Sequence, residues 1–351
     1  MIGTMNALLK TAPKPGAMEY VENFPIPQIA DDEVLMEIKA VGICGTDHSL
    51  HKWNEAIANS YKLTWPSVFG HEFSGVLAEV GSKAPADLKV GDRVTANPVK
   101  YCNTCSYCDE GLTNICDNRP FYGTDLPGAF AKYMKIRASN VIKMPDAVSF
   151  VQGALIEPLC VALNAVDRLN PQMGETAVVI GPGAIGLLMV AVLKQARGID
   201  KVIVTGLDAD AGRLKVAEQL GAITINASQC DVMEKVKQLT NGKGPEMVFD
   251  AAGHFSVSEQ AVDMVAKNGR IGITGLPAKG STIPMTKVSL REITIIGNRA
   301  YERKNFRQAL NLLANGFNID AVASHVMPLS DWHKGMELLD KSEGLRIILE
   351  P

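Results

Sequence analysis

Four of the seven cysteines lie within fifteen residues, in the stretch CNTCSYCDEGLTNIC. They are Cys102, Cys105, Cys108 and Cys116, with the spacing C-x2-C-x2-C-x7-C. Short loops of this kind can direct four thiolates at one tetrahedral ion. An iron–sulfur cluster would favour three residues before the fourth cysteine and a proline after it, whereas here seven residues precede it and Asp117 follows. The spacing predicts a structural zinc ion. Since four thiolates leave no position for a substrate, the chemistry is expected elsewhere.

A second group of metal-binding side chains comes from three separate places in the sequence. Cys44 stands in GICGTD, His71 and Glu72 stand in FGHEFSG, and Glu157 stands in LIEPLC. Each alone is weak evidence, because a single buried cysteine is more often an inert core residue. Together, one thiolate, one imidazole and one or two carboxylates are typical of a catalytic zinc site that keeps a position open. Such an ion acts as a Lewis acid and lowers the pKa of a bound hydroxyl toward about 7.

A glycine motif indicates a third kind of site. In the stretch TAVVIGPGAIGLLMVAVLKQA, an apolar strand leads into G-x-G-x-x-G and then into a helix. The motif residues are Gly181, Gly183, Ala184, Ile185 and Gly186. This context provides a tight turn, a close approach of the backbone to a pyrophosphate, and a helix N-terminus for the phosphates. The stretch therefore predicts binding of a nicotinamide dinucleotide.

The end of the next predicted strand bears on the choice between NAD and NADP. An acidic residue that binds the ribose 2′-hydroxyl is expected there, but the position is Gly206. Asp208 and Asp210 follow at once and would repel a 2′-phosphate, while the nearest arginine, Arg213, stands seven residues on inside a predicted helix. The pattern favours NAD, with Asp208 as the ribose partner, and leaves NADP open.

The elements that must position these groups change character along the chain. The first third contains short runs rich in β-branched residues between Gly, Pro and Asp, which indicates a compact all-β unit. From about residue 154, apolar strands alternate with helical patterns, which indicates an α/β unit with a doubly wound parallel sheet. The joint between the two is expected within residues 150–160.

Composition excludes several classes of function. The 351 residues are 46% hydrophobic and 21% charged with a net charge of −3, which gives no basic face for nucleic acid and no signal for an anionic membrane. The N-terminal residues lack the apolar run of a secretory signal, and the longest apolar run is too short to span a bilayer. A cytoplasmic protein with reduced thiols is expected, which disfavours a disulfide pair.

These motifs resemble the zinc-containing medium-chain alcohol dehydrogenases over almost the whole chain. GHEFSGVLAEVGSKA (70–84) resembles the zinc signature of that family, and CGTD, GHE and Glu157–Pro158 are most similar to the sorbitol (polyol) and threonine dehydrogenase branch. The resemblance implies a GroES-like β catalytic domain of residues 1–156 and 296–351, with a structural-zinc lobe at about 98–120. It also implies a Rossmann domain of residues 157–295.

The resemblance further implies two zinc ions per chain. Cys44, His71 and either Glu72 or Glu157 would hold the catalytic ion, and the four clustered cysteines would hold the other. The implied reaction is hydride transfer between NAD(P) and a secondary hydroxyl of a small polyol-like substrate, in a homo-dimer or homo-tetramer. An L-threonine 3-dehydrogenase-like activity is the alternative, since HKWNEA after CGTD is similar to that branch. A catalytically silent binding relative is disfavoured, because all the proposed ligands are present.

The resemblance also implies a proton relay, and here the sequence departs from the family. The hydroxyl expected two residues after Cys44 is present as Thr46. The histidine that the family usually has five residues after this cysteine is replaced by Ser49. Histidines flank it at His48 and His51. One interpretation is that water completes the relay through Ser49. The other moves the relay to a flanking histidine, with His51 preferred if the segment is a strand, since alternate residues share a face there.

Overall fold

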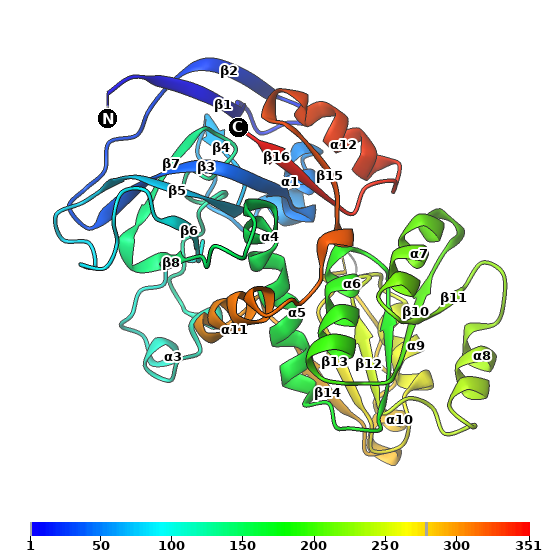
Figure 1. The fold of residues 1–351 in the computed structure, drawn as a ribbon. Helices are drawn as coiled ribbons and strands as arrows, with labels where there is room; N and C mark the ends of the chain where they lie inside the picture. Colours follow the sequence, from blue (N-terminus) through cyan, green and yellow to red (C-terminus); the bar gives the residue numbers. More distant parts are fainter. Residues whose placement is uncertain (1, 278–279) are drawn as a thin grey trace. The chain divides into compact units, whose positions relative to one another are not determined.

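The computed structural model describes residues 2–277 and 280–351, which form two compact units (Figure 1). The first unit comprises Met1–Glu157, Glu302–Gly316 and Ala323–Pro351, and the second comprises Pro158–Tyr301 and Phe317–Val322.

Residues 296–351 are expected in the catalytic domain, but two short segments of this range, 296–301 and 317–322, belong to the second unit. Residues 296–301 belong to the second unit, where the last strand ends at Gly297 and the Asn298 amide donates to the Ile273 carbonyl. Residues 317–322 are tied to the second unit by Gln195, whose side chain bonds both the backbone amide and the carbonyl of Asn318 at 3.0 Å.

The first unit is built on two sheets whose strands pair antiparallel, except for β15 and β16, which pair parallel. Its main sheet has the order β15-β16-β3-β5-β6-β8, with β7 also paired to β3, and a smaller sheet has the order β2-β1-β4. The strands are β1 (Thr4–Lys10), β2 (Met18–Pro25), β3 (Glu33–Ile43), β4 (Ser67–Val68), β5 (Glu72–Val80), β6 (Arg93–Ala96), β7 (Tyr133–Arg137), β8 (Val141–Lys143), β15 (Ala323–Pro328) and β16 (Arg346–Glu350).

Strand β3 is the centre of this unit. Its sequence EVLMEIKAVGI is a nearly continuous apolar run, as expected for a strand covered on both faces. The core around it includes the fully buried side chains of Leu35, Ile43, Phe69 and Phe130. The chain's C-terminal strand β16 pairs antiparallel with the end of β3, so the two ends of the sequence contribute to one core.

The helices of the first unit are mostly short, and one longer helix continues from this unit into the second. They are α1 (Gly45–His51), α2 (Glu55–Ala58), α3 (Ser106–Asp109), α4 (Phe150–Ala154), α11 (Arg303–Ala314) and α12 (Trp332–Asp340). Helix α5 (Ile156–Leu169) begins in the first unit and continues into the second.

The second unit is a six-stranded parallel sheet with helices on its faces (Figure 1). The order β11-β10-β9-β12-β13-β14 corresponds to 3-2-1-4-5-6 in this unit, the doubly wound order of a dinucleotide-binding fold. The strands are β9 (Thr176–Ile180), β10 (Lys201–Gly206), β11 (Ile223–Asn226), β12 (Met247–Asp250), β13 (Arg270–Ile273) and β14 (Thr294–Gly297). The helices are α6 (Ala184–Ala191), α7 (Ala211–Gln219), α8 (Val232–Leu239), α9 (Val257–Met264) and α10 (Met285–Leu290).

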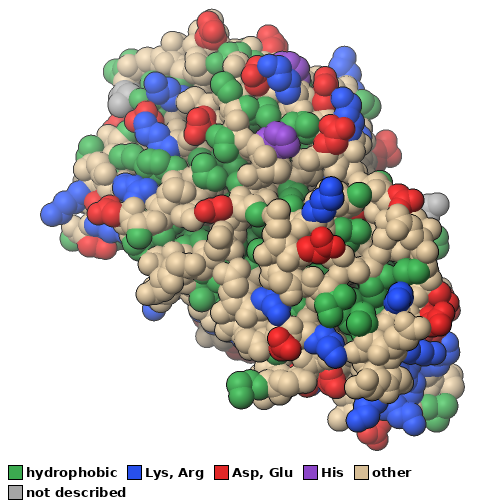
Figure 2. All heavy atoms as spheres, turned by 45° about the vertical axis from the view of Figure 1, so that its right-hand side comes forward, with side chains coloured by type: hydrophobic (Ala, Val, Ile, Leu, Met, Phe, Trp, Pro, Cys, Tyr) green, Lys and Arg blue, Asp and Glu red, His purple; other side chains and the backbone are tan. Residues whose placement is uncertain are grey.

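The surface fits the small net charge. On the face shown in Figure 2, acidic and basic side chains are interspersed with apolar ones over both units. Among the described residues, no helix combines the length and apolar character needed to cross a bilayer.

Candidate active site

Three of the predicted catalytic-zinc ligands converge in the first unit. Ligand atoms of Cys44, His71 and Glu72 all lie within 4.8 Å of one another. The His71 and Glu72 side chains are buried, whereas Cys44 is half-buried. A thiolate, an imidazole and a carboxylate at this separation fit one tetrahedral metal ion with a further position available.

Strand register explains how residues so far apart in sequence meet. Strands β3 and β5 pair antiparallel with Gly42 opposite Glu72, so the residues just beyond the end of β3 lie beside those just before β5. Cys44 follows β3 and His71 precedes β5. On the other side of β3, β16 pairs with Ile347 opposite Ile43, which brings Arg346 to the same end of the sheet.

Asp47 fixes the relative position of these segments. Its carboxylate accepts from the Cys44 amide at 2.9 Å and from the Gly70 amide at 3.3 Å, and lies 3.8 Å from His71 Nδ1. Burial raises the pKa of Asp47, opposed by the nearby His71. Burial alone would lower the pKa of His71, but Asp47, Cys44 and Glu157 outweigh it and hold that pKa well above its ordinary value. The cluster is thus set up for a cation.

Glu72 has a cationic partner on its inner side. Arg346 Nε lies 3.1 Å from Glu72 Oε2, and Arg346 Nη1 donates to the Ile43 carbonyl at 2.9 Å. Burial would lower the pKa of Arg346, but Glu72 and the other anions around it raise that pKa instead. Gly42 leaves room for this pair, because a Cβ there would lie 2.4 Å from Glu72 Oε2 and displace the carboxylate.

Glu157 lies near the cluster but outside the group of three. It stands in the first turn of α5, is 8% exposed, and contributes to the raised pKa of His71. Glu72 is more deeply buried, and its negative charge is already paired with Arg346. Both carboxylates therefore remain candidates for the zinc site.

Asp47 and Arg346 were not among the residues expected from the sequence. The signal for Asp47 was available, since an acidic residue three positions after the N-cap of a helix is a capping pattern. Arg346 had no such signal. Its contact with Glu72 depends on the pairing of β16 with β3, which joins opposite ends of the chain.

The four clustered cysteines also converge. Their Sγ atoms lie within 4.8 Å of one another, with separations of 4.0 Å for Cys102–Cys108, 3.9 Å for Cys105–Cys116 and 3.5 Å for Cys102–Cys116. Zinc–sulfur bonds of about 2.3 Å in a tetrahedron require sulfur separations of about 3.8 Å. The lobe fits a closed zinc site formed by four thiolates.

The glycine motif occupies the position expected for a dinucleotide site in the second unit. It joins β9 to α6, with Gly183 as the N-cap of the helix. Strands β9 and β12 are neighbours from opposite halves of the doubly wound sheet, so the loop lies at the switch point of its topology.

Asp208 and Asp210 lie in a short turn after β10. Asp208 Oδ1 accepts from Asn226 Nδ2 at 2.8 Å and from Gln229 Nε2 at 2.9 Å. Asp210 pairs with Arg213 Nη1 at 3.2 Å, one turn into α7. A carboxylate is thus held at the end of β10, while the charge of Arg213 is partnered by Asp210.

The segment after Cys44 differs from one expectation. Residues 45–51 form helix α1 rather than a strand, so the strand argument that favoured His51 is wrong. A helical residue lies beside those three and four positions away, which brings Ser49, not His51, next to Thr46. His48 Nε2 lies 2.6 Å from Asp340 Oδ1, and the His51 ring packs edge-on against Trp332.

Comparison with known proteins identifies the family. Residues 30–146 match the model of the alcohol dehydrogenase GroES-like domain, and residues 184–315 match that of the zinc-binding dehydrogenases. L-threonine 3-dehydrogenase of Bacillus velezensis is 36% identical, with all of both chains covered. The chain belongs to the zinc-containing medium-chain alcohol dehydrogenase family. It is an NAD(P)-dependent oxidoreductase with a GroES-like and a Rossmann domain.

Other relatives of this dehydrogenase carry different names. Sorbitol dehydrogenase of Bacillus subtilis (strain 168) is 35% identical, with 94% of both chains covered. Among solved structures, the alcohol dehydrogenase rspB from E. coli CFT073 with NADH is 29% identical, with a TM-score of 0.90 and 99% and 100% of the two chains covered. A zinc-binding dehydrogenase from Sinorhizobium meliloti 1021 bound to NADP is 27% identical, with a TM-score of 0.89 and both chains fully covered.

Proposed function

We propose that this dehydrogenase transfers hydride between NAD and a secondary hydroxyl of a small polyol-like substrate. The observation that carries the proposal is the convergence of Cys44, His71 and Glu72, a ligand set with an open position. Similarity to a sorbitol dehydrogenase over 94% of both chains supports the polyol class of substrate.

The proposed metal site uses Cys44, His71 and one of Glu72 and Glu157. When bound, zinc supplies a Lewis acid that makes a substrate hydroxyl more acidic. The chain's own contribution is positional. Asp47 ties the Cys44 and Gly70 backbones together, and Arg346 balances the charge of Glu72, so the ligands are held before metal binds.

The proposed proton path begins at Thr46. Its hydroxyl stands in the first turn of α1, two residues after Cys44 and half-buried. Ser49 stands three residues further along the helix, on the same side, and is also half-buried. We assign Thr46 as the first acceptor of the substrate proton, with Ser49 and solvent completing the path.

A threonine dehydrogenase-like activity is the second candidate, favoured by the 36% identity to L-threonine 3-dehydrogenase. Formation of reduced nicotinamide, followed by its near-ultraviolet absorbance with NAD and NADP, separates the two over a panel of polyols, vicinal diols and L-threonine. We expect the highest kcat/KM with a polyol or diol and NAD. Highest efficiency with L-threonine would establish the second candidate. If no substrate of the panel gave more reduced nicotinamide with the wild type than with a Cys44→Ser control, both candidate activities would be refuted.

We also propose a cytoplasmic homo-dimer or homo-tetramer with two zinc ions per chain. Strand β14 is an edge of the parallel sheet, and exposed apolar side chains stand near it in sequence at Leu276, Met285 and Leu290. An unpaired strand edge and exposed apolar side chains each favour association with a second copy. Analytical ultracentrifugation should give a mass of two or four chains; a monomer at micromolar concentration would contradict this.

A further inference from the structure

The end of β10 in this chain cannot hold the acidic residue that usually binds the ribose. A Cβ built on Gly206 would lie 2.9 Å from Pro182 Cγ, and Pro182 is part of the glycine motif itself. A side chain at residue 206 would therefore require the phosphate-binding loop to move. The carboxylate must come from another position.

Asp208 supplies a carboxylate two residues further on, and two neutral amides hold it there. Asn226 stands at the end of the neighbouring strand β11 and Gln229 in the loop that follows, and both donate to the same oxygen, Oδ1. Ser228 accepts from the Asp208 amide at 3.1 Å. Because a carboxylate has acceptor sites on both oxygens, Oδ2 can still accept from a hydroxyl.

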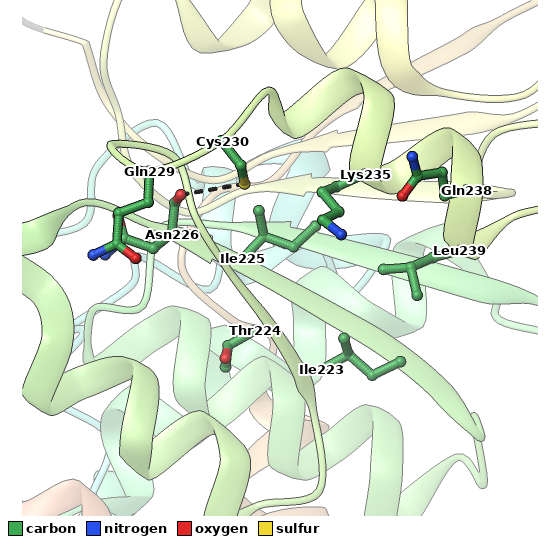
Figure 3. A pocket seen from close by; sticks show the side chains of 9 residues that line it. All are labelled: Ile223, Thr224, Ile225, Asn226, Gln229, Cys230, Lys235, Gln238 and Leu239. Atoms are coloured by element: carbon green, nitrogen blue, oxygen red, sulfur yellow. Dashed lines mark hydrogen bonds between the residues drawn. The ribbon is translucent and has the colours of Figure 1, made fainter.

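These amide donors converge on one point, as the donors of an anion site do. Figure 3 shows Asn226 and Gln229 side by side at one end of a pocket of about 480 Å³ between β11 and α8. The residues that line the pocket include one charged side chain, Lys235, toward the other end. At their end of the pocket, the amide groups of Asn226 and Gln229 are both directed at the Asp208 carboxylate.

Arg213 is the second part of the arrangement. An arginine near the end of the second strand is the usual partner of a 2′-phosphate. Here Arg213 Nη1 lies 3.2 Å from Asp210 Oδ1, and Asp210 Oδ2 accepts from the Leu207 amide at 3.1 Å. Asp210 is thereby fixed at the start of α7 and balances the charge of Arg213.

We propose that Asp208 occupies a built anion cradle formed by Asn226 and Gln229, and that this internal carboxylate sets the preference for NAD over NADP. Asp208 accepts a hydrogen bond from the ribose 2′-hydroxyl. It excludes a 2′-phosphate by its negative charge and by engaging the amide donors of Asn226 and Gln229. Asp210 reinforces the exclusion by keeping Arg213 neutralised. This proposal rests on the proposed NAD-dependent function and adds the residues that determine the nucleotide.

The test is direct binding of NADH and NADPH to the zinc-loaded enzyme, measured by calorimetry and needing no substrate. The variants are Asp208→Ser and the double variant Asp208→Ser with Asp210→Asn. Asp200→Ser is the matched control, because Asp200 is an exposed aspartate at the opposite end of β10. We expect the wild type and the control to bind NADH at least tenfold more tightly than NADPH. Asp208→Ser should reduce this ratio at least tenfold, and the double variant should invert it.

Gln229→Ala separates positioning from charge. It leaves the Asp208 carboxylate in place but removes one of its two holders, so NADH should bind more weakly without any gain for NADPH. If Asp208→Ser keeps the ratio of the Asp200→Ser control, or if the wild type prefers NADPH, the cradle proposal is overturned. If neither nucleotide binds the folded wild type, the proposed function itself fails.

Discussion

At the scale of single residues, Asp47 matters most for the geometry of the zinc-ligand cluster. It joins the backbones of the two ligand-bearing segments and faces His71 at 3.8 Å. Asp47→Asn keeps the size of the side chain but removes its charge. Residues that orient metal ligands typically contribute 10–100-fold to metal affinity or activity. We expect a loss of that order in zinc affinity, measured by competition with a chelator. Asp31→Asn, an exposed carboxylate of the same unit, is the control, and unchanged affinity in Asp47→Asn would contradict this role.

The proton path makes a second prediction at this scale. Because α1 brings Ser49 beside Thr46, Ser49→Ala should lower kcat, whereas His48→Gln and His51→Gln should not. Burial, then the positive charge of Lys10, lowers the pKa of His51, which disfavours the protonated form of this ring. The measurement is kcat against pH. If the acidic limb of the kcat profile shifts in either histidine variant while Ser49→Ala keeps the wild-type profile, a histidine rather than Ser49 carries the proton.

At the scale of elements, the sequence predicted what short-range patterns encode. The alternation of strands and helices is encoded in this way, and the fold confirms it. The glycine motif and the cysteine spacing also lie each within one stretch of chain, and the motif joins a strand to a helix while the four cysteines converge. The preference for His51 depended on residues 45–51 being a strand, whereas the capping of Cys44 by Asp47 starts a helix there. Arg346 could not have been predicted, because strand register between β16 and β3, not sequence, places it beside Glu72.

Lys10 connects several elements without taking part in the chemistry. The last residue of β1, it is fully buried, and its ammonium donates to the carbonyls of Lys14 at 2.6 Å, Gly16 at 2.5 Å and His51 at 3.3 Å. It also lies 5.8 Å from the ring centroid of Trp53. The ammonium thus anchors the loop after β1 and the end of α1. Burial lowers the pKa of Lys10 to about 8 from 10.5.

This lowered pKa predicts how stability depends on pH. Between about pH 8 and pH 10.5 the unfolded chain keeps the Lys10 proton and the folded chain releases it, so the free energy of unfolding rises with pH across this window. Below pH 8 the penalty for burying the charge is fully present. We expect the stability of the wild type relative to Lys10→Met, from urea unfolding, to increase from pH 8 to pH 10.5. The exposed Lys267→Met serves as control, and a difference independent of pH would contradict the argument.

At the scale of the whole molecule, the metal-binding groups and the nucleotide-binding motif lie in different units. Each has its own hydrophobic core, one around the two mainly antiparallel sheets and one around the parallel sheet. Both groups of metal-binding residues lie in the first unit, and the glycine motif and Asp208 lie in the second. Zinc and nucleotide should therefore stabilise different units, since a ligand stabilises the part of the native protein that binds it.

The two metal groups of the first unit make the last prediction, because one is closed and the other open. Four thiolates bind zinc as part of folding, whereas a site of three protein ligands keeps an exchangeable position. Elemental analysis should give two zinc ions per chain, and brief chelation should remove the one held by Cys44 first. Cys44→Ser should retain one zinc and nearly the wild-type unfolding temperature but lose turnover. Cys105→Ser should also retain one zinc, yet unfold several degrees lower, because the loops of the lobe lose the ion that joins them. Two zinc ions in Cys105→Ser, or full activity in a wild type with a single ion, would contradict this assignment.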